Sequence, residues 1–141
     1  MLNIRIVAVG CLKEKYLVDA VAEYAKRLTR YCRLEIIQIR ESDIKTETSE
    51  IQTKLKGHVI LCDIGGELFS SAQLSQKIQS LSQTTSCITF VVGGSNGVGQ
   101  LTVNQCLSFG RITLPHQLFR VILVEQIYRA FTIIKGEKYH K

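Results

Sequence analysis

The order of strand-like and helix-like segments predicts an α/β domain with a mainly parallel sheet and helices on both faces. Short runs rich in Val, Ile and Leu alternate with longer segments of helical period along the 141 residues, which is typical of α/β layers. Several runs are apolar at nearly every position, as expected of strands buried on both faces. The length fits one domain, residues 1–141, large enough for its own core.

The first half of the chain is predicted to alternate strand, helix, strand and helix. Ile4–Val9 is rich in β-branched residues and is followed by a glycine, which is typical of a strand. Glu14–Tyr31 repeats its apolar residues at helical spacing, with basic residues outside. Leu34–Ile39 is a second strand, and the charged segment Glu41–Lys56 has weak helical periodicity.

The alternation continues in the second half. A third strand is expected over His58–Ile64 and a fourth over Cys87–Val92. Between them Ser70–Leu81 has helical spacing, with Ser70 or Ser71 as the N-cap.

After the fourth strand the pattern predicts a loop, a short helix and a short fifth strand before the last helix. These segments are the loop Gly93–Gly99, the helix Gln100–Leu107, the strand and loop Ser108–Leu114, and the helix Leu118–Lys135. Ligands of such sheets bind at the carboxyl ends of the strands. The loops to inspect therefore follow Cys62 and Val92 and surround Gly110.

The net charge of +6 is unevenly distributed. Residues 1–57 carry eleven Lys or Arg against eight Asp or Glu, residues 58–110 one against two, and residues 111–141 six against two. Basic ends around a near-neutral centre suit a polyanionic partner such as nucleic acid. A merely soluble basic protein would have the same composition, and charge alone does not separate the two.

Five cysteines and three histidines show no CxxC and no metal-ligand spacing, which favours reduced, packed thiols over disulfides or a metal site. No stretch approaches the roughly 20 apolar residues of a membrane span. The start of the chain resembles a strand and not a signal peptide, so we expect a cytoplasmic protein.

The segment Gly93–Gly99, GGSNGVG, follows a buried strand and gives a ligand close access to the backbone. It is neither GxGxxG nor a P-loop, so it excludes the usual NAD and ATP sites. A nucleotide-like ligand and a plain glycine-rich turn both stay open. Further on, Pro115 marks a helix start that Thr113 can cap, and His116 is expected at the mouth of a pocket beside the glycine loop.

The last helix is apolar almost all round, with Glu125 and Arg129 spaced to pair at i,i+4. Since a domain this small has few elements to cover both sides of such a helix, we expect a second copy to cover one side across a twofold axis. The tail Gly136–Lys141 is either a frayed end or an arm that offers Lys, Tyr and His to RNA.

Taken together, these segments resemble the RlmH family, the ribosomal RNA large subunit methyltransferases of the SPOUT superfamily. The matching motifs are IGG and VGG-S-N-G, SF-x-x-x-T-x-PHQ, EQIYRAF, and GExYHK. The N-terminal AVGCLKEKY and AEYAKRL are similar to that family too, so the likeness extends from Met1 to Lys141.

The resemblance implies a single SPOUT methyltransferase domain with a C-terminal deep trefoil knot that works as a homodimer. It also implies methyl transfer from S-adenosylmethionine to N3 of a pseudouridine in 23S rRNA, with pseudouridine 1915 as the family target, on the large subunit or the 70S ribosome. Carried over residue by residue, the cofactor contacts are Cys62, Gly93, Phe109, Gly110, Arg111, Ile112, Thr113 and Leu114. Relatives usually carry Leu at Cys62, Ser at Gly110 and a longer charged stretch at 41–56.

We hypothesise that the catalytic roles fall on His116, on the last helix and on the tail. His140 and His116 are candidate bases for the N3 proton, Tyr139 orients the target base or stacks on it, and Glu125 with Arg129 holds tail and substrate. The tail of one subunit is expected to complete the site of the other. An alternative class stays open: a non-catalytic RNA- or ribosome-binding SPOUT-like protein, for which Cys62 and Gly110 are the only support.

Overall fold

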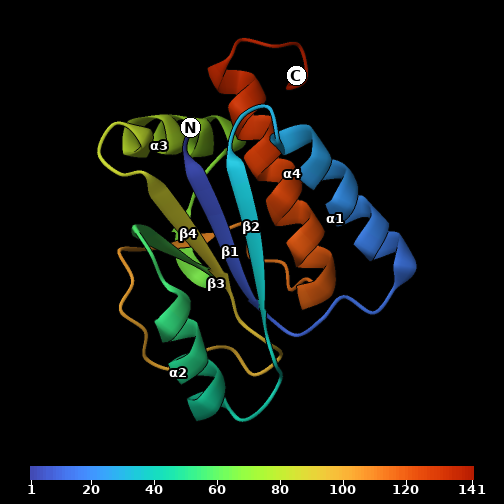
Figure 1. Ribbon diagram of the computed structural model, residues 1–141, viewed down its shortest axis with the longest axis vertical. Coiled ribbons are helices and arrows are strands. Elements are labelled where there is room, and N and C mark those ends of the chain that lie inside the picture. Colours follow the sequence, from blue (N-terminus) through green and yellow to red (C-terminus); the bar gives the residue numbers. More distant parts are fainter.

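Five parallel strands form one sheet in the order β2-β1-β4-β3-β5, in a computed structural model that describes residues 1–141 (Figure 1). The strands are β1 (Asn3–Val9), β2 (Arg33–Ile39), β3 (His58–Leu68), β4 (Cys87–Val92) and β5 (Gln105–Ser108). The helices are α1 (Lys15–Leu28), α2 (Ile44–Lys54), α3 (Ser71–Ser82) and α4 (His116–Ile134). The predicted parallel α/β fold is confirmed.

Helices cover both faces of this sheet, as predicted. Along β1, Ile4, Ile6 and Ala8 point into the larger core, which contains residues of α1, α3 and α4. Val7 and Val9 point the other way, into a smaller core with residues of α2. The alternation follows from the two-residue period of a strand.

The larger layer places α4 between α1 and α3, both of which contact it. Leu123, Val124, Ile127 and Ala130 are fully buried there. The expectation that so small a domain lacks elements to cover this helix is therefore wrong for its two flanks, which α1 and α3 cover.

No membrane-spanning helix is found in the structure, since every helix is too short or too polar for one.

The predicted helix Gln100–Leu107 is wrong, because this segment contains no helix and leads into strand β5. Asn104 attaches it to the edge of the sheet. Its amide donates to the carbonyl of Val59 at 2.9 Å, and its side-chain Oδ1 accepts from the amide of Val59 at 2.8 Å. The fifth strand accordingly lies before the predicted Ser108–Leu114 and shares only Ser108 with it.

β3 is longer than predicted because it stays paired with β5 after its pairing with β4 ends. Ile60 to Cys62 pair with both neighbours, and after an irregularity Glu67 and Leu68 pair with β5 only. Gly66 makes this approach possible, since a Cβ there would lie 2.8 Å from the carbonyl carbon of Cys106. The chain beyond Cys62 is thereby held beside β5.

Helix caps confirm one prediction and correct another. Ser70 caps α3 in a reciprocal capping box with Gln73. Thr113 does not cap α4, whose N-cap is Pro115 without a side-chain hydrogen bond. The helix begins at His116, so that residue sits at a helix N-terminus.

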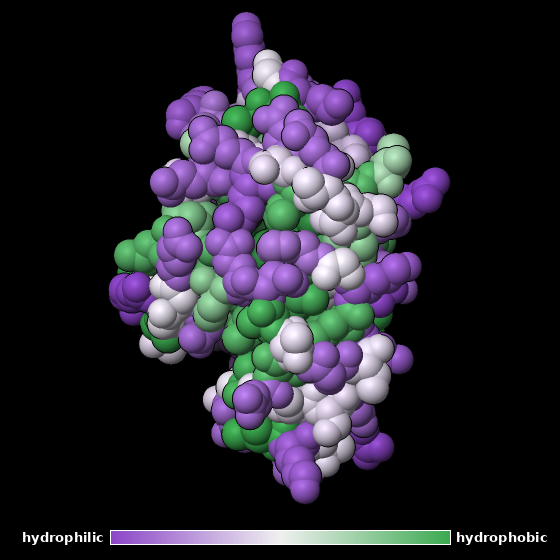
Figure 2. All heavy atoms as spheres, turned by 90° about the vertical axis from the view of Figure 1, so that its left-hand side faces the viewer, coloured by the Kyte–Doolittle hydropathy of each residue, from purple (hydrophilic) through white to green (hydrophobic).

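The face shown in Figure 2 is mostly hydrophilic in its upper part, whereas hydrophobic residues show mainly in the lower half. Three large hydrophobic side chains near the later part of β3 and in the loop before α4 are exposed to solvent: Ile64, Leu68 and Ile112.

Candidate functional site

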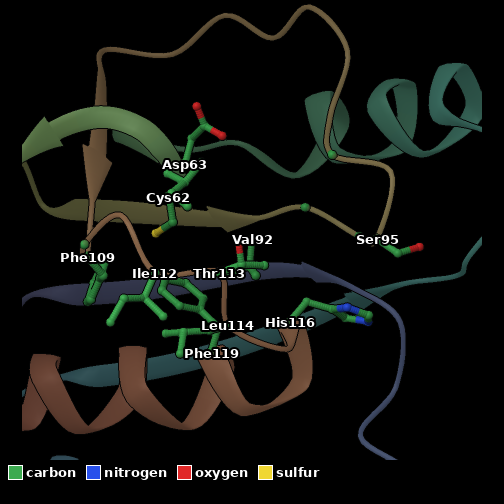
Figure 3. A pocket seen from close by; sticks show the side chains of 15 residues that line it. Cys62, Asp63, Val92, Ser95, Phe109, Ile112, Thr113, Leu114, His116 and Phe119 are labelled. Atoms are coloured by element: carbon green, nitrogen blue, oxygen red, sulfur yellow. The ribbon is translucent and has the colours of Figure 1, made fainter.

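A cavity of about 300 Å³ opens at the carboxyl ends of β3, β4 and β5 (Figure 3). Three segments that are far apart in the sequence form its walls. They are the part of β3 just beyond its pairing with β4, with Cys62, Asp63 and Ile64, the end of β4 and its following loop from Val92 to Gly97, and the segment from Phe109 to Phe119. This is the edge at which the predicted parallel sheet was expected to bind a ligand.

Seven of the eight residues predicted to contact the cofactor line this cavity, and Arg111 is the exception. Its guanidinium donates instead to the carbonyl of Ile64, at the opposite wall. Arg111 therefore joins two walls and does not face the space between them. Among the other lining residues, only Phe119 lies outside the loops and the His116 position that the sequence singled out.

Aromatic contacts shape the apolar end of the cavity. Phe109 packs edge-to-face between Phe69 and Phe119, with 4.9 Å between ring centroids on each side. Cys62 lies at the same end, and burial raises the pKa of its thiol, so the group is neutral near pH 7. Aromatic and apolar side chains of this kind suit a flat heterocycle.

The loop around Gly110 is held by a local hydrogen-bond pair. The amide of Gly110 donates to Ser108 Oγ at 3.2 Å, and that hydroxyl donates to the carbonyl of Gly110 at 3.0 Å. Gly110 has φ +135°, and a Cβ there would meet no atom within 4 Å. The backbone conformation, and not lack of space, thus favours a glycine here.

His116 and Ser95 lie at the end of the cavity opposite Cys62 and Phe109 (Figure 3). His116 is the first residue of α4, and neither nitrogen of its ring hydrogen-bonds to another protein group. It is the only histidine at the cavity, so its imidazole is free to hydrogen-bond to a bound ligand.

The other four predicted catalytic residues form a separate cluster between α4 and the tail. Glu125 Oε2 accepts from Arg129 Nη2 and from the Tyr139 hydroxyl, each at 2.8 Å. Arg129 Nη1 lies 3.1 Å from His140 Nδ1. Burial, and then the hydrogen bond to Glu125, raise the pKa of Tyr139, so Tyr139 is a hydrogen-bond donor and not a base.

The tail is packed against its own chain and does not fray. The Tyr31 hydroxyl of the α1–β2 turn donates to Glu137 Oε2 at 2.7 Å, and Arg30 lies 3.6 Å from the same carboxylate. Tyr139 packs edge-to-face on Tyr128 at 4.8 Å. The last residues therefore have a defined position at the C-terminal end of α4 (Figure 1).

The cavity and the tail cluster lie near opposite ends of α4. His116 begins the helix and Arg129 comes thirteen residues later, which corresponds to about 20 Å along the axis. One chain therefore does not bring His140, Tyr139, Arg129 and Glu125 to the predicted cofactor residues. Only His116 is common to the catalytic prediction and the cavity.

Arg120 is a buried cation that sequence reasoning missed. It is 1% exposed, and its Nη2 donates to the carbonyls of Val9 and Gly10 at the end of β1. Burial lowers its pKa, and two of its nitrogens, Nε and Nη1, have no partner. The signal in the sequence was a lone arginine among apolar residues of the last helix.

A family model described as "Predicted SPOUT methyltransferase" matches residues 2–140 of this chain. The chain is 43% identical to "Ribosomal RNA large subunit methyltransferase H" of Latilactobacillus sakei, over 99% of this chain and 100% of the relative. It is 44% identical to "Ribosomal RNA large subunit methyltransferase H 1" of Clostridium perfringens and 42% identical to the protein of the first name from Listeria monocytogenes, with the same coverage.

These alignments extend over 159 positions, more than the 141 residues of the chain. The relatives are thus longer, as expected. That the missing length lies in the charged stretch 41–56 stays a prediction.

Proposed function

Because this chain belongs to the SPOUT methyltransferase family, we propose that it methylates ribosomal RNA of the large subunit. The finer proposal is transfer of a methyl group from S-adenosylmethionine to N3 of a pseudouridine in 23S rRNA. The basic residues near the two ends of the chain support a polyanionic substrate. Because the proposed substrate is ribosomal RNA, we propose that the reaction takes place in the cytoplasm, on the large subunit or the 70S particle.

The lining of the cavity supports S-adenosylmethionine as the methyl donor. Its apolar end, with Phe109 and Leu114, suits the purine ring of this cofactor. The loops that contain Gly93 and Gly110 also line the cavity, and their backbone groups can hydrogen-bond to the polar atoms of the cofactor. When bound, this cofactor supplies a methyl carbon activated by a sulfonium. The protein's own contribution is then to align the acceptor nitrogen, and alignment supplies several kcal/mol in such reactions.

One observation carries the proposed arrangement of the active site: the cavity and the tail cluster lie near opposite ends of α4. A twofold axis that sets two α4 helices antiparallel would bring the tail of each copy to the cavity of the other. Arg129, Tyr139 and His140 would then meet the target base at the methyl donor. We therefore propose a homodimer in which two chains share each site.

Two side chains are proposed to handle the N3 proton and its charge. His116 and His140 are the titratable candidates, and Tyr139 offers its ring for stacking on the target base. Glu125 holds both Tyr139 and Arg129, which fixes the tail before substrate arrives. Such preorganised polar groups stabilise developing charge without reorganisation.

The proposal is tested by a chain that ends at Glu137. It lacks Lys138–Lys141 but keeps the whole cavity, so calorimetric titration should give nearly unchanged binding of S-adenosylmethionine. Methylation of 23S rRNA in large subunits, read by mass spectrometry, should fall by about 100-fold or more. Full activity of the shortened chain would refute the role of the tail, and absence of cofactor binding to the full chain would refute the enzyme.

A further inference from the structure

The hydrogen bond between Arg129 and His140 decides which nitrogen of the imidazole carries the proton. Arg129 Nη1 and His140 Nδ1 are 3.1 Å apart. A guanidinium has donors only, so His140 Nδ1 must accept with its lone pair. In the neutral ring the proton then lies on Nε2.

Arg129 is not free to turn away from this contact. Its Nη2 donates to Glu125 Oε2 at 2.8 Å, and its guanidinium lies 4.8 Å from the centroid of the Tyr139 ring. Glu125 is held in turn by the Tyr139 hydroxyl and by Gln126 Nε2. The arginine is therefore held by Glu125 and by the Tyr139 ring, in a position from which its Nη1 donates to His140.

The backbone of the tail is fixed as well. The amide of Glu137 donates to the carbonyl of Thr132 at 2.9 Å, and the amide of Tyr139 donates to the carbonyl of Glu137 at 3.1 Å. His140 is itself exposed. Its one engaged nitrogen faces its own chain, and Nε2 is left for a substrate.

We propose that His140 donates a hydrogen bond from Nε2–H to a carbonyl oxygen beside the reacting nitrogen of the target base, and that it is not the base. This inference rests on the proposed function and assigns one residue of that site. A proton cannot be added at Nδ1 while Arg129 donates to it, and Nε2 already carries one. The base that removes the N3 proton is then His116, whose two ring nitrogens are unengaged at the cavity.

The assignment matches the movement of charge. When the N3 proton passes to His116, negative charge spreads onto the two carbonyl oxygens that flank N3. A donor placed at one of them stabilises this anion until its electron pair forms the new bond to the methyl carbon, as the carbon–sulfur pair returns to sulfur. The reaction then ends with a neutral methylated base and a protonated His116.

The tautomer itself is tested without substrate or cofactor, by long-range proton–nitrogen NMR of protein labelled with ¹⁵N-histidine near pH 8. We expect His140 to show an unprotonated Nδ1 and a protonated Nε2, with the signal assigned by its loss in His140→Gln. In Arg129→Met the constraint is gone, and a mixture of tautomers is expected. A proton on Nδ1 of His140 in the unmodified chain would overturn the inference.

A matched pair of variants separates a donor from a base. His140→Gln keeps an N–H near the position of Nε2 and should retain methylation within about tenfold, whereas His140→Glu has an acceptor only and should lose about 100-fold or more. Equal loss in both, or higher activity of the glutamate variant, contradicts the donor role. Cofactor titration checks that both variants are folded, and an unmodified chain without activity would refute the proposed function and not the tautomer.

Discussion

At the scale of single residues, Tyr31 is the clearest anchor of the tail. Its hydroxyl donates to Glu137 Oε2 at 2.7 Å, and its ring stacks on Phe131 at 5.7 Å. Burial first, and then the hydrogen bond to Glu137, raise the pKa of this phenol from 10.0 to about 12. The neutral phenol is thus the form that the folded state favours.

This pKa predicts how stability depends on alkaline pH. Because the folded pKa lies above the unfolded one, the contribution of Tyr31 is complete below pH 10 and is lost as the pH rises towards 12. At pH 8, Tyr31→Phe should lower the free energy of unfolding by roughly 1 kcal/mol. In urea titrations that deficit should shrink as the pH approaches 11. The exposed Tyr16→Phe is the control, and a deficit that is independent of pH would contradict the assignment.

At this scale, the positions of residues that belong to a sequence motif could be predicted, whereas the contacts of residues outside such motifs could not. The cavity-lining Cys62, Gly93 and Phe109 followed from the resemblance, because whole motifs surround them. Arg111 and Arg120 depend on contacts across the fold, with the carbonyls of Ile64 and of Val9 and Gly10. No local pattern indicates such partners.

At the scale of elements, the N-terminus of α3 carries a prediction that is independent of function. Ser70 Oγ accepts from the amide of Gln73 at 3.1 Å, and Gln73 Oε1 accepts from the amide of Ser70 at 2.8 Å. Ser70→Ala should lower the free energy of unfolding by about 1 kcal/mol, as measured by chemical denaturation, with cofactor binding unchanged. Ser80→Ala, in the same helix without such a bond, should have no comparable effect.

The approach of β3 to β5 carries a prediction about the cavity. In Gly66→Ala the new Cβ would meet the carbonyl of Cys106 at 2.8 Å, so the short strand β5 must shift. We expect a loss of about 1–3 kcal/mol in stability and weaker binding of S-adenosylmethionine, because both strands lead into the cavity walls.

The adjacent glycine is the matched control. In Gly65→Ala the added Cβ meets only a carboxylate oxygen of Asp63 at 3.3 Å. Similar behaviour of the two variants, in thermal unfolding and in calorimetric titration, would contradict the steric argument.

Elements with a strong period were predictable, whereas β5 was not. The bounds of β4 match the prediction, since Cys87–Val92 is an uninterrupted buried run. β5 is only four residues long, and half of it is partly exposed. Its strand character comes from pairing with β3, which local spacing does not reveal.

At the scale of the whole molecule, the arrangement of the sheet explains why the cavity forms and why the tail of the same chain does not reach it. The order β2-β1-β4-β3-β5 brings Cys62–Ile64 of β3 and the loops after β4 and β5 together, and there the predicted cofactor residues meet. It leaves the tail at the other end of α4. The distance between the cavity and the tail could not be predicted from the sequence, because it depends on the direction in which α4 crosses the sheet. The trefoil knot, implied by the resemblance, and the homodimer, expected also from the apolar last helix, remain predictions.

The most direct test of the shared site is methylation by a mixture of two inactive chains. One carries Leu114→Arg, which fills the cavity, and the other ends at Glu137, which removes His140. In a twofold dimer one of the two sites of each mixed pair has an intact cavity and an intact tail. Unfolding and reassembling the two chains together should therefore restore up to about one quarter of the activity of the unmodified dimer. No restored methylation, with mixed dimers present by mass spectrometry, would contradict the account.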